Sequence, residues 1–228
     1  MISGGARGIG AAVCRRLLPE GYALSLGLRP GGTQPDFAAT APSDQLFLYP
    51  FDAADRASHA PWVEATAARF GGIDALINCA GIGGPARLAD ASEEALDRLW
   101  AVNAKAPLHL IQLALPHLRR CGCGRIFNVA SLSGKRVKND NVGYAMTKFA
   151  LVALTHTVRQ QEWASGLRCT AICPGFVRTD MTAAVTKVAP EDMTRPEDIA
   201  EAVALLLRLP NTASVSEFAI NCRAEDVY

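Results

Sequence analysis

Apolar positions along the chain gather in short runs that alternate with longer amphipathic stretches. The runs at 22–28, 46–51, 73–78, 125–130, 167–173 and 215–221 predict strands. Helical periodicity predicts helices over 8–18, 60–70, 92–118 and 141–164, and another that begins at 195. Pro107 is expected to bend the helix over 92–118. The first three residues form one more strand, which is very short.

This alternation predicts an α/β fold. Short, continuous apolar strands between helices are typical of a doubly wound parallel sheet with helices on both faces. We count about seven strands and find no linker or repeat, so we expect a single domain over residues 1–228. In such folds ligands bind beyond the carboxyl ends of the strands, so candidate chemistry is sought there.

Composition narrows the function classes. The 228 residues carry 23 Lys and Arg against 22 Asp and Glu, a net charge of +1 that argues against a nucleic-acid partner. No apolar run reaches the ~18 residues of a transmembrane helix, and no signal peptide opens the chain, so we expect a cytoplasmic protein without a membrane partner.

Seven cysteines do not form the spacing of a secreted disulfide framework, and we expect them to be reduced. Cys121 and Cys123, which have one residue between them, are the only pair whose spacing suggests a metal. No histidine or further cysteine pair stands at ligand spacing from them, so we predict no metal site.

A glycine-rich loop follows the first strand and opens the first helix. Its glycines allow a tight turn and a close backbone approach, and the helix N-terminus offers N–H groups to a diphosphate. An ordinary strand–helix turn is the alternative. The candidate diphosphate-binding residues are Ser3, Gly4, Arg7, Gly8, Ile9 and Gly10.

The end of the second strand bears on the choice of cofactor. Dinucleotide-binding folds that prefer NAD usually carry an acid there, whereas this chain has Leu28 and Arg29. An arginine suits the 2′-phosphate of NADP, and Arg7 is a second cation. We therefore predict NADP(H) in preference to NAD(H); the alternative is that either arginine is only a solvated surface residue.

Three polar residues suggest catalysis. Tyr144 and Lys148 are four positions apart, which places both on one helix face. Ser131 follows a strand end and lies 13 positions before Tyr144, so both hydroxyls could reach one substrate oxygen. Taken singly, such a pair also arises by chance, and a serine after a strand is commonly a cap.

Together with the glycine loop, these residues resemble the short-chain dehydrogenase/reductase family over nearly the whole chain. The matching motifs occur in the family's order, although Cys79 stands where the family usually has asparagine and Ser3 where it usually has threonine. The resemblance implies a Rossmann-like fold and an NAD(P)-dependent oxidoreductase that interconverts a carbonyl and a secondary alcohol.

The resemblance also implies roles for individual residues. Tyr144 would be the general acid, Lys148 would support it and hold the nicotinamide ribose, Ser131 would polarise the carbonyl, and Asn103 would anchor a water that relays protons. Asp52 would bind the adenine amino group. Asn78, Ala80 and Gly81 would line the adenosine ribose, and Pro174, Gly175, Val177 and Thr179 would cradle the nicotinamide. Asp52 as a helix cap and Asn103 as a structural amide are the alternatives.

The partners expected are a small carbonyl or alcohol substrate and further copies of the chain. Few residues separate Met181 from Arg195, where the family has its substrate lid, which favours a small or partly exposed substrate. The helix over 141–164 is more apolar than one buried face requires, which predicts a homodimer or homotetramer. A catalytically silent dinucleotide-binding scaffold or sensor is the alternative function, although such proteins typically lose the tyrosine or the lysine.

Overall fold

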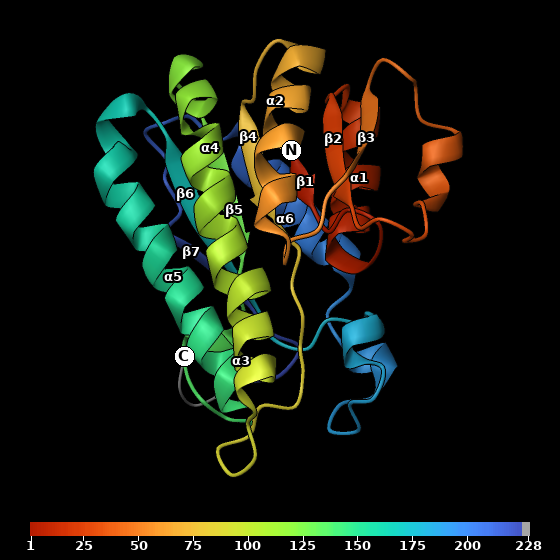
Figure 1. Cartoon of the computed structure of the whole chain (residues 1–228), viewed down its shortest axis with the longest axis vertical. Helices are drawn as coiled ribbons and strands as arrows, with labels where there is room; N and C mark the ends of the chain where they lie inside the picture. Colours follow the sequence, from red (N-terminus) through yellow and green to blue (C-terminus); the bar gives the residue numbers. More distant parts are fainter. Residues whose placement is uncertain (225–228) are drawn as a thin grey trace.

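The computed structural model of the chain describes residues 1–224 and contains one sheet of seven parallel strands in the order β3-β2-β1-β4-β5-β6-β7 (Figure 1). The predicted α/β fold is thereby confirmed. The strands are β1 (Ile2–Ser3), β2 (Leu24–Leu28), β3 (Leu46–Pro50), β4 (Ala75–Asn78), β5 (Arg125–Val129), β6 (Arg168–Pro174) and β7 (Glu217–Ile220).

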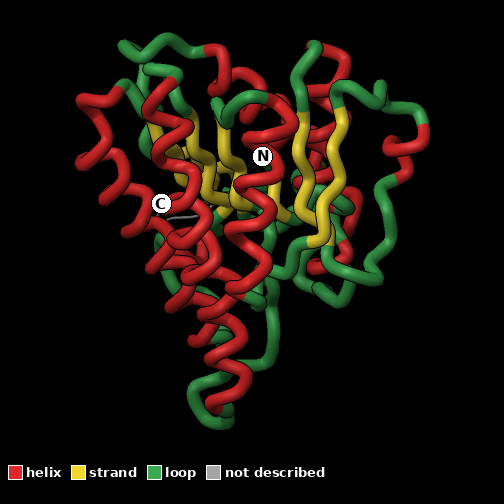
Figure 2. The backbone as a smooth tube through the Cα atoms, turned by 45° about the horizontal axis from the view of Figure 1, so that its top comes forward, coloured by secondary structure: helices red, strands yellow, loops and turns green. Residues whose placement is uncertain are grey.

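Helices cover both faces of the sheet, and in Figure 2 the strands form the layer between them. They are α1 (Gly8–Leu17), α2 (His59–Phe70), α3 (Glu93–Trp100), α4 (Ala106–Arg120), α5 (Val142–Glu162) and α6 (Pro196–Arg208). Helices α1 and α6 pack together on one face, and α2, α4 and α5 lie on the other (Figure 1). The strand order reverses between β1 and β4, and folds of this kind bind their ligands beyond the carboxyl ends of the strands at such a point.

Two apolar layers hold the sheet. Ile2, Leu26 and Ile77 face α1 and α6, whereas Trp62 of α2 and Leu110 of α4 belong to the core on the opposite face. All residues of β5 and β6 are buried, as expected of central strands with helices on both sides. Each large apolar side chain that is fully buried contributes roughly 1.5–3 kcal/mol to the stability of the fold. The core therefore holds these strands, and with them the strand ends, firmly in place.

The helical stretch over 92–118 is interrupted, but not where we expected. The break is a turn of π-helix at Ala101–Lys105, and Pro107 lies in the first turn of α4. Proline is tolerated in a first turn because its missing N–H would have no partner there. The π turn contains the buried Asn103, and such turns often occur at functional sites.

Among residues 1–224, no helix is long and apolar enough to cross a membrane. That part of the chain also contains no group of three or more histidines, cysteines or acids placed to hold a metal ion.

Candidate active site

The glycine loop makes a turn that side chains would obstruct. Gly4 and Gly8 have φ values of +71° and +54°, a region that favours glycine. A Cβ on Gly10 would lie 2.2 Å from the Gly4 carbonyl oxygen, so the loop and the first turn of α1 touch. The loop therefore leaves its backbone N–H groups, rather than side chains, next to the end of β1.

The loop is fastened to the end of β4. The Ser3 hydroxyl is buried and accepts hydrogen bonds from the backbone N–H groups of Cys79 and Ala80, both at 3.2 Å. Cys79 is desolvated, and this burial raises the pKa of its thiol to about 11. Asn78 is also buried and donates to the Asn128 side chain at 2.8 Å, which ties β4 to β5. Its role at a ribose stays a prediction.

The N-terminus of α1 is suited to an anion. Its first turn has no acidic residue, and the side chain of Arg7, the residue that precedes the helix, does not cap it. Ile9 packs against the core and anchors the turn. Arg7 instead forms an ion pair with Asp180 at 2.9 Å, and both side chains are more than two-thirds exposed, at 74% and 71%.

The ends of β2 and β3 carry the two residues predicted to meet the adenosine half of a dinucleotide. Arg29 is exposed, and among residues 1–224 its guanidinium has no hydrogen bond or ion pair. Asp52 accepts the backbone N–H of Ala54 at 2.9 Å. Asp55, not Asp52, is the N-cap of the short helical turn that follows. One Asp52 oxygen is therefore left for another donor.

Tyr144 and Lys148 come together on α5, as their spacing predicts. The Lys148 ammonium lies 5.5 Å from the centre of the Tyr144 ring, and it donates to the Val129 carbonyl oxygen at 2.9 Å. Lys148 is only 4% exposed, whereas Tyr144 is half-buried. A buried cation thus stands beside a phenol that solvent and small molecules can reach.

Ser131 follows β5 by two residues and is half-buried. Its hydroxyl oxygen accepts the backbone N–H of Ser133 at 3.0 Å, so it caps the short turn Leu132–Gly134. This bond uses one lone pair, and the hydroxyl hydrogen is still able to donate to a substrate oxygen. The capping role therefore does not compete with the predicted catalytic role.

Asn103 joins the segment after β4 to α5. Its side chain is fully buried, exchanges two hydrogen bonds of 2.9 Å with the backbone of Ile82, and donates to the Thr147 hydroxyl at 3.2 Å. A Cβ on Gly81 would lie 3.5 Å from the Asn103 side-chain oxygen and 3.6 Å from the Lys148 nitrogen. Gly81 thus keeps the space beside Lys148 open.

Thr147 is a residue that the sequence reasoning missed. It is buried between the two predicted catalytic positions and donates to the Tyr144 carbonyl oxygen at 2.8 Å while it accepts from Asn103. A hydroxyl residue one position before the lysine was the available signal, but only the fold shows that it faces the π turn.

The segment after β6 completes the site. Gly175 donates to the Ile220 carbonyl oxygen at 2.8 Å, and a Cβ on it would lie 2.1 Å from the Asn221 side-chain oxygen. Val177 is buried and pairs with Thr194. A Cβ on Gly8 would lie 3.2 Å from the Thr179 methyl carbon, so this segment lies against the glycine loop.

The predicted residues therefore gather at one edge of the sheet. Contacts among the ends of β1, β4 and β6 and the start of α5 connect the glycine loop, the Gly81 segment, Lys148 and Thr179. Arg29 and Asp52 lie at the ends of the two strands on the other side of β1. In Figure 1 the loop before α3 and the segment that contains residues 180–192 project from this same end of the molecule.

Comparison with known proteins decides the family. A family model described as short chain dehydrogenase matches residues 1–189. The chain belongs to the short-chain dehydrogenase/reductase family. The curated relatives described here are named as a reductase and an oxidoreductase. An uncharacterized oxidoreductase of Staphylococcus aureus (strain MW2) is 30% identical to the chain over 222 residues, which cover 96% of the chain and 95% of the relative.

A second relative is more similar but longer. An agropine synthesis reductase of Rhizobium rhizogenes is 41% identical over 230 residues, which cover 100% of this chain and 53% of that protein. The chain thus spans about half the length of this relative. Among solved structures, an alcohol dehydrogenase from the archaeon Thermococcus sibiricus, complexed with 5-hydroxy-NADP, is 29% identical with a TM-score of 0.84, and the match covers 96% of this chain and 94% of that one.

The site geometry of this short-chain dehydrogenase/reductase is compatible with a bound nicotinamide dinucleotide. The start of α1 carries no acid that would repel a diphosphate. A side chain at Gly10 would clash with the backbone of the glycine loop. Gly81 leaves room beside Lys148 where a ribose could approach the ammonium. These features occur together beyond the carboxyl ends of β1 and β4.

Proposed function

We propose that the protein is an NADP(H)-dependent oxidoreductase that interconverts a small carbonyl compound and its secondary alcohol. The observation that carries the proposal is the placement of Lys148, 5.5 Å from the Tyr144 ring, at the sheet edge that also carries the glycine loop. A bound NADPH would supply the hydride to the carbonyl carbon.

Each catalytic side chain has one task in this proposal. Tyr144 donates a proton to the carbonyl oxygen, and Ser131 donates a hydrogen bond to the same oxygen. The Lys148 ammonium stabilises the negative charge that develops on the Tyr144 oxygen and holds the nicotinamide ribose. In the reduction, the carbonyl carbon gains a hydride and its oxygen a proton, so the products are the alcohol and NADP⁺.

The proton lost by Tyr144 has to be replaced. Because both side-chain groups of Asn103 are engaged with Ile82 and Thr147, a relaying water would be held by the Asn103 backbone. Asn103 is then both a buried structural amide and the water's anchor. Thr147 positions this residue relative to α5.

The cofactor preference rests on Arg29 and Arg7. A charge-assisted hydrogen bond is worth roughly 1.5–3 kcal/mol, so one arginine on the 2′-phosphate gives about a 10- to 150-fold preference for NADPH. The kcat/KM values for NADPH and NADH, measured with one carbonyl substrate, test this preference. Replacement of Leu28 by Asp together with Arg29 by Ala is expected to invert this preference. The double change removes the guanidinium that attracts the 2′-phosphate and adds a carboxylate that repels it. An equal or higher value with NADH in the unaltered protein would contradict the proposal.

The substrate is proposed to be small or partly exposed. Residues 180–192 form only two short helical turns, and Met181 is 54% exposed. A panel of carbonyls and alcohols, followed at the nicotinamide absorbance with both cofactors, identifies the substrate class. Cofactor binding without turnover on the whole panel would instead favour a silent dinucleotide-binding scaffold or sensor.

We also propose a cytoplasmic homodimer or homotetramer. Leu108 of α4 and Met146 and Phe149 of α5 are apolar and between 42% and 48% exposed, which leaves an apolar surface for a second copy. Sedimentation at micromolar concentration tests the assembly, and a sole species of 24.2 kDa would contradict it. Cell fractionation tests the compartment.

A further inference from the structure

The turn after α4 carries two cysteines that the proposed oxidoreductase reaction does not use. Cys121 follows the last residue of α4 and Gly122 has a φ of +67°, so the chain turns back toward the helix end. Two residues that are two positions apart can be separated by at most ~7 Å even when extended, and this turn brings them closer. A separation of this order is compatible with the ~4.4–6.8 Å between the Cα atoms of disulfide-bonded cysteines.

The two thiols differ in exposure. Cys123 is exposed, whereas Cys121 is half-buried. The Cys121 thiol donates to the Leu118 carbonyl oxygen at 3.1 Å. Burial raises the pKa of Cys121, which makes it the slower thiol to react with a reagent from solution.

Two hydrogen bonds and one close backbone approach hold this turn in place. The Arg125 guanidinium donates to the Cys123 carbonyl oxygen at 2.9 Å, and the Asn211 side chain donates to the Gly122 carbonyl oxygen at 3.0 Å. A Cβ on Gly124 would lie 2.6 Å from the Leu118 carbonyl oxygen. The backbone of the turn that carries both thiols is therefore held in place by the fold.

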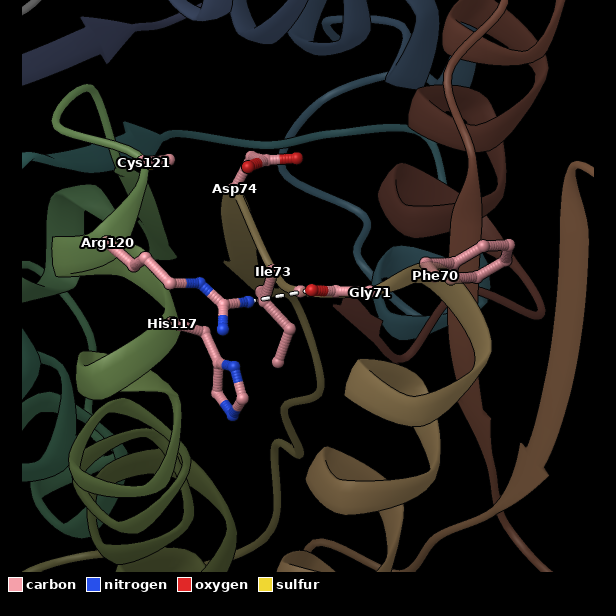
Figure 3. A pocket seen from close by; sticks show the side chains of 8 residues that line it. Phe70, Gly71, Ile73, Asp74, His117, Arg120 and Cys121 are labelled. Carbon is pink, nitrogen blue, oxygen red and sulfur yellow. Dashed lines mark hydrogen bonds between the residues drawn. The ribbon is translucent and has the colours of Figure 1, made fainter.

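A cavity of about 280 Å³ opens directly beside Cys121 (Figure 3). Its lining includes His117 and Arg120 of α4 and Asp74, which directly precedes β4. Arg120 also donates to the Gly71 carbonyl oxygen at 2.7 Å, which holds its guanidinium at the cavity. A cation and a carboxylate in the lining of one cavity are complementary to a small peptide that carries both carboxylate and ammonium groups.

We propose that Cys121 and Cys123 form a thiol–disulfide exchange site for a low-molecular-weight peptide disulfide. The Cys123 thiolate attacks one sulfur of the disulfide, which breaks that bond and releases the first peptide thiol. The Cys121 thiolate then attacks the Cys123 sulfur, forms the internal disulfide and releases the second peptide thiol. Two cysteines thus lose two electrons and two protons, and the peptide disulfide is reduced to two thiols.

The sequence offers a direct assay. Trypsin cleaves after Arg120 and Arg125, so both cysteines fall in the peptide 121–125. After incubation of the native protein with oxidised glutathione, this peptide should be two hydrogens lighter than its reduced form. Cys14 and Cys169, which are buried, should stay unmodified and report that the protein is folded.

Single variants assign the order of the two steps. Cys121→Ser should accumulate a glutathione adduct on Cys123, because no thiol resolves it. Cys123→Ser should slow modification of Cys121 by at least about tenfold, because the remaining thiol is half-buried. Arg120→Gln, in which trypsin releases the peptide 120–125 instead, should slow the reaction with oxidised glutathione but not with uncharged hydroxyethyl disulfide.

Three results would overturn the proposal. One is a peptide 121–125 that stays reduced while the half-buried Cys222 is modified. Another is a stable Cys123 adduct in the unaltered protein, and the third is an unchanged rate in Cys123→Ser. The assay needs neither a carbonyl substrate nor a nicotinamide cofactor, so it is independent of the reductase activity.

Discussion

Asp180 is predicted to compete with the 2′-phosphate for Arg7. Arg7 lies in the glycine loop, and its guanidinium is 2.9 Å from the Asp180 carboxylate. If Arg7 is to bind the phosphate, this ion pair has to loosen first. The variant Asp180→Asn keeps the side-chain shape, removes the charge, and is expected to strengthen NADPH binding without any change in NADH binding.

The size of the effect follows from the exposure of the pair. Side chains that are 74% and 71% exposed form an ion pair worth about 0.2–1 kcal/mol, because water screens both charges. Removal of the competitor should therefore lower the Kd for NADPH by about 1.4- to 5-fold. The effect should shrink as salt is raised, since the Debye length is ~10 Å at 0.1 M and ~3 Å at 1 M.

Titration of the nicotinamide fluorescence at low and high salt measures both dissociation constants. Asp192→Asn removes a charge from an exposed acid farther along the same segment and serves as the matched control. Asp180→Asn made in an Arg7→Gln background should have no effect, which completes a double-mutant cycle. An unchanged or weaker affinity of Asp180→Asn for NADPH would refute the reasoning and would mean that Asp180 orients Arg7 toward the phosphate.

Two further predictions concern stability. Gly10→Ala should lower the free energy of unfolding by about 1–3 kcal/mol, because the new Cβ would lie 2.2 Å from the Gly4 carbonyl oxygen. Gly83→Ala, whose Cβ would meet nothing within 4 Å, is the control and should change the free energy of unfolding by less than about 0.5 kcal/mol. Urea unfolding compares the two variants, and equal losses would contradict the packing argument. The second prediction concerns pH. Burial lowers the pKa of His59, whose Nδ1 lies 3.0 Å from Nδ1 of His109. The unfolded chain therefore takes up the proton at a higher pH than the folded protein does, and stability should fall as the pH drops below ~6.5. Urea unfolding between pH 7.5 and 5 measures this loss, which His59→Phe should reduce; an identical pH dependence in both proteins would exclude His59 as its source.

Much of the fold was predictable because it follows from local patterns. Central strands such as β5 and β6 are buried on both faces and read as continuous apolar runs. The spacing of Tyr144 and Lys148 on one helix also sufficed to place the two side chains together, and the structure confirms their proximity. These features depend on periodicities of a few residues, which a sequence displays directly.

Features that depend on distant contacts were not predictable. The π turn lies at Asn103 and not at Pro107, because the Asn103 side chain is held by Ile82 and Thr147, which lie on other segments. The Arg7–Asp180 ion pair spans most of the chain length and left no local signal. The sequence displayed both charges, but only the fold brings them together.

The most direct test of the central claim is the turnover of Tyr144→Phe on a carbonyl substrate found in the panel, with NADPH binding measured in parallel. The variant removes the proposed proton donor and keeps the ring beside Lys148. We expect kcat to fall by about 10²- to 10⁴-fold while the Kd for NADPH stays within about twofold. Near-full turnover by the variant would contradict the assignment of Tyr144 as the general acid and, with it, the proposed mechanism.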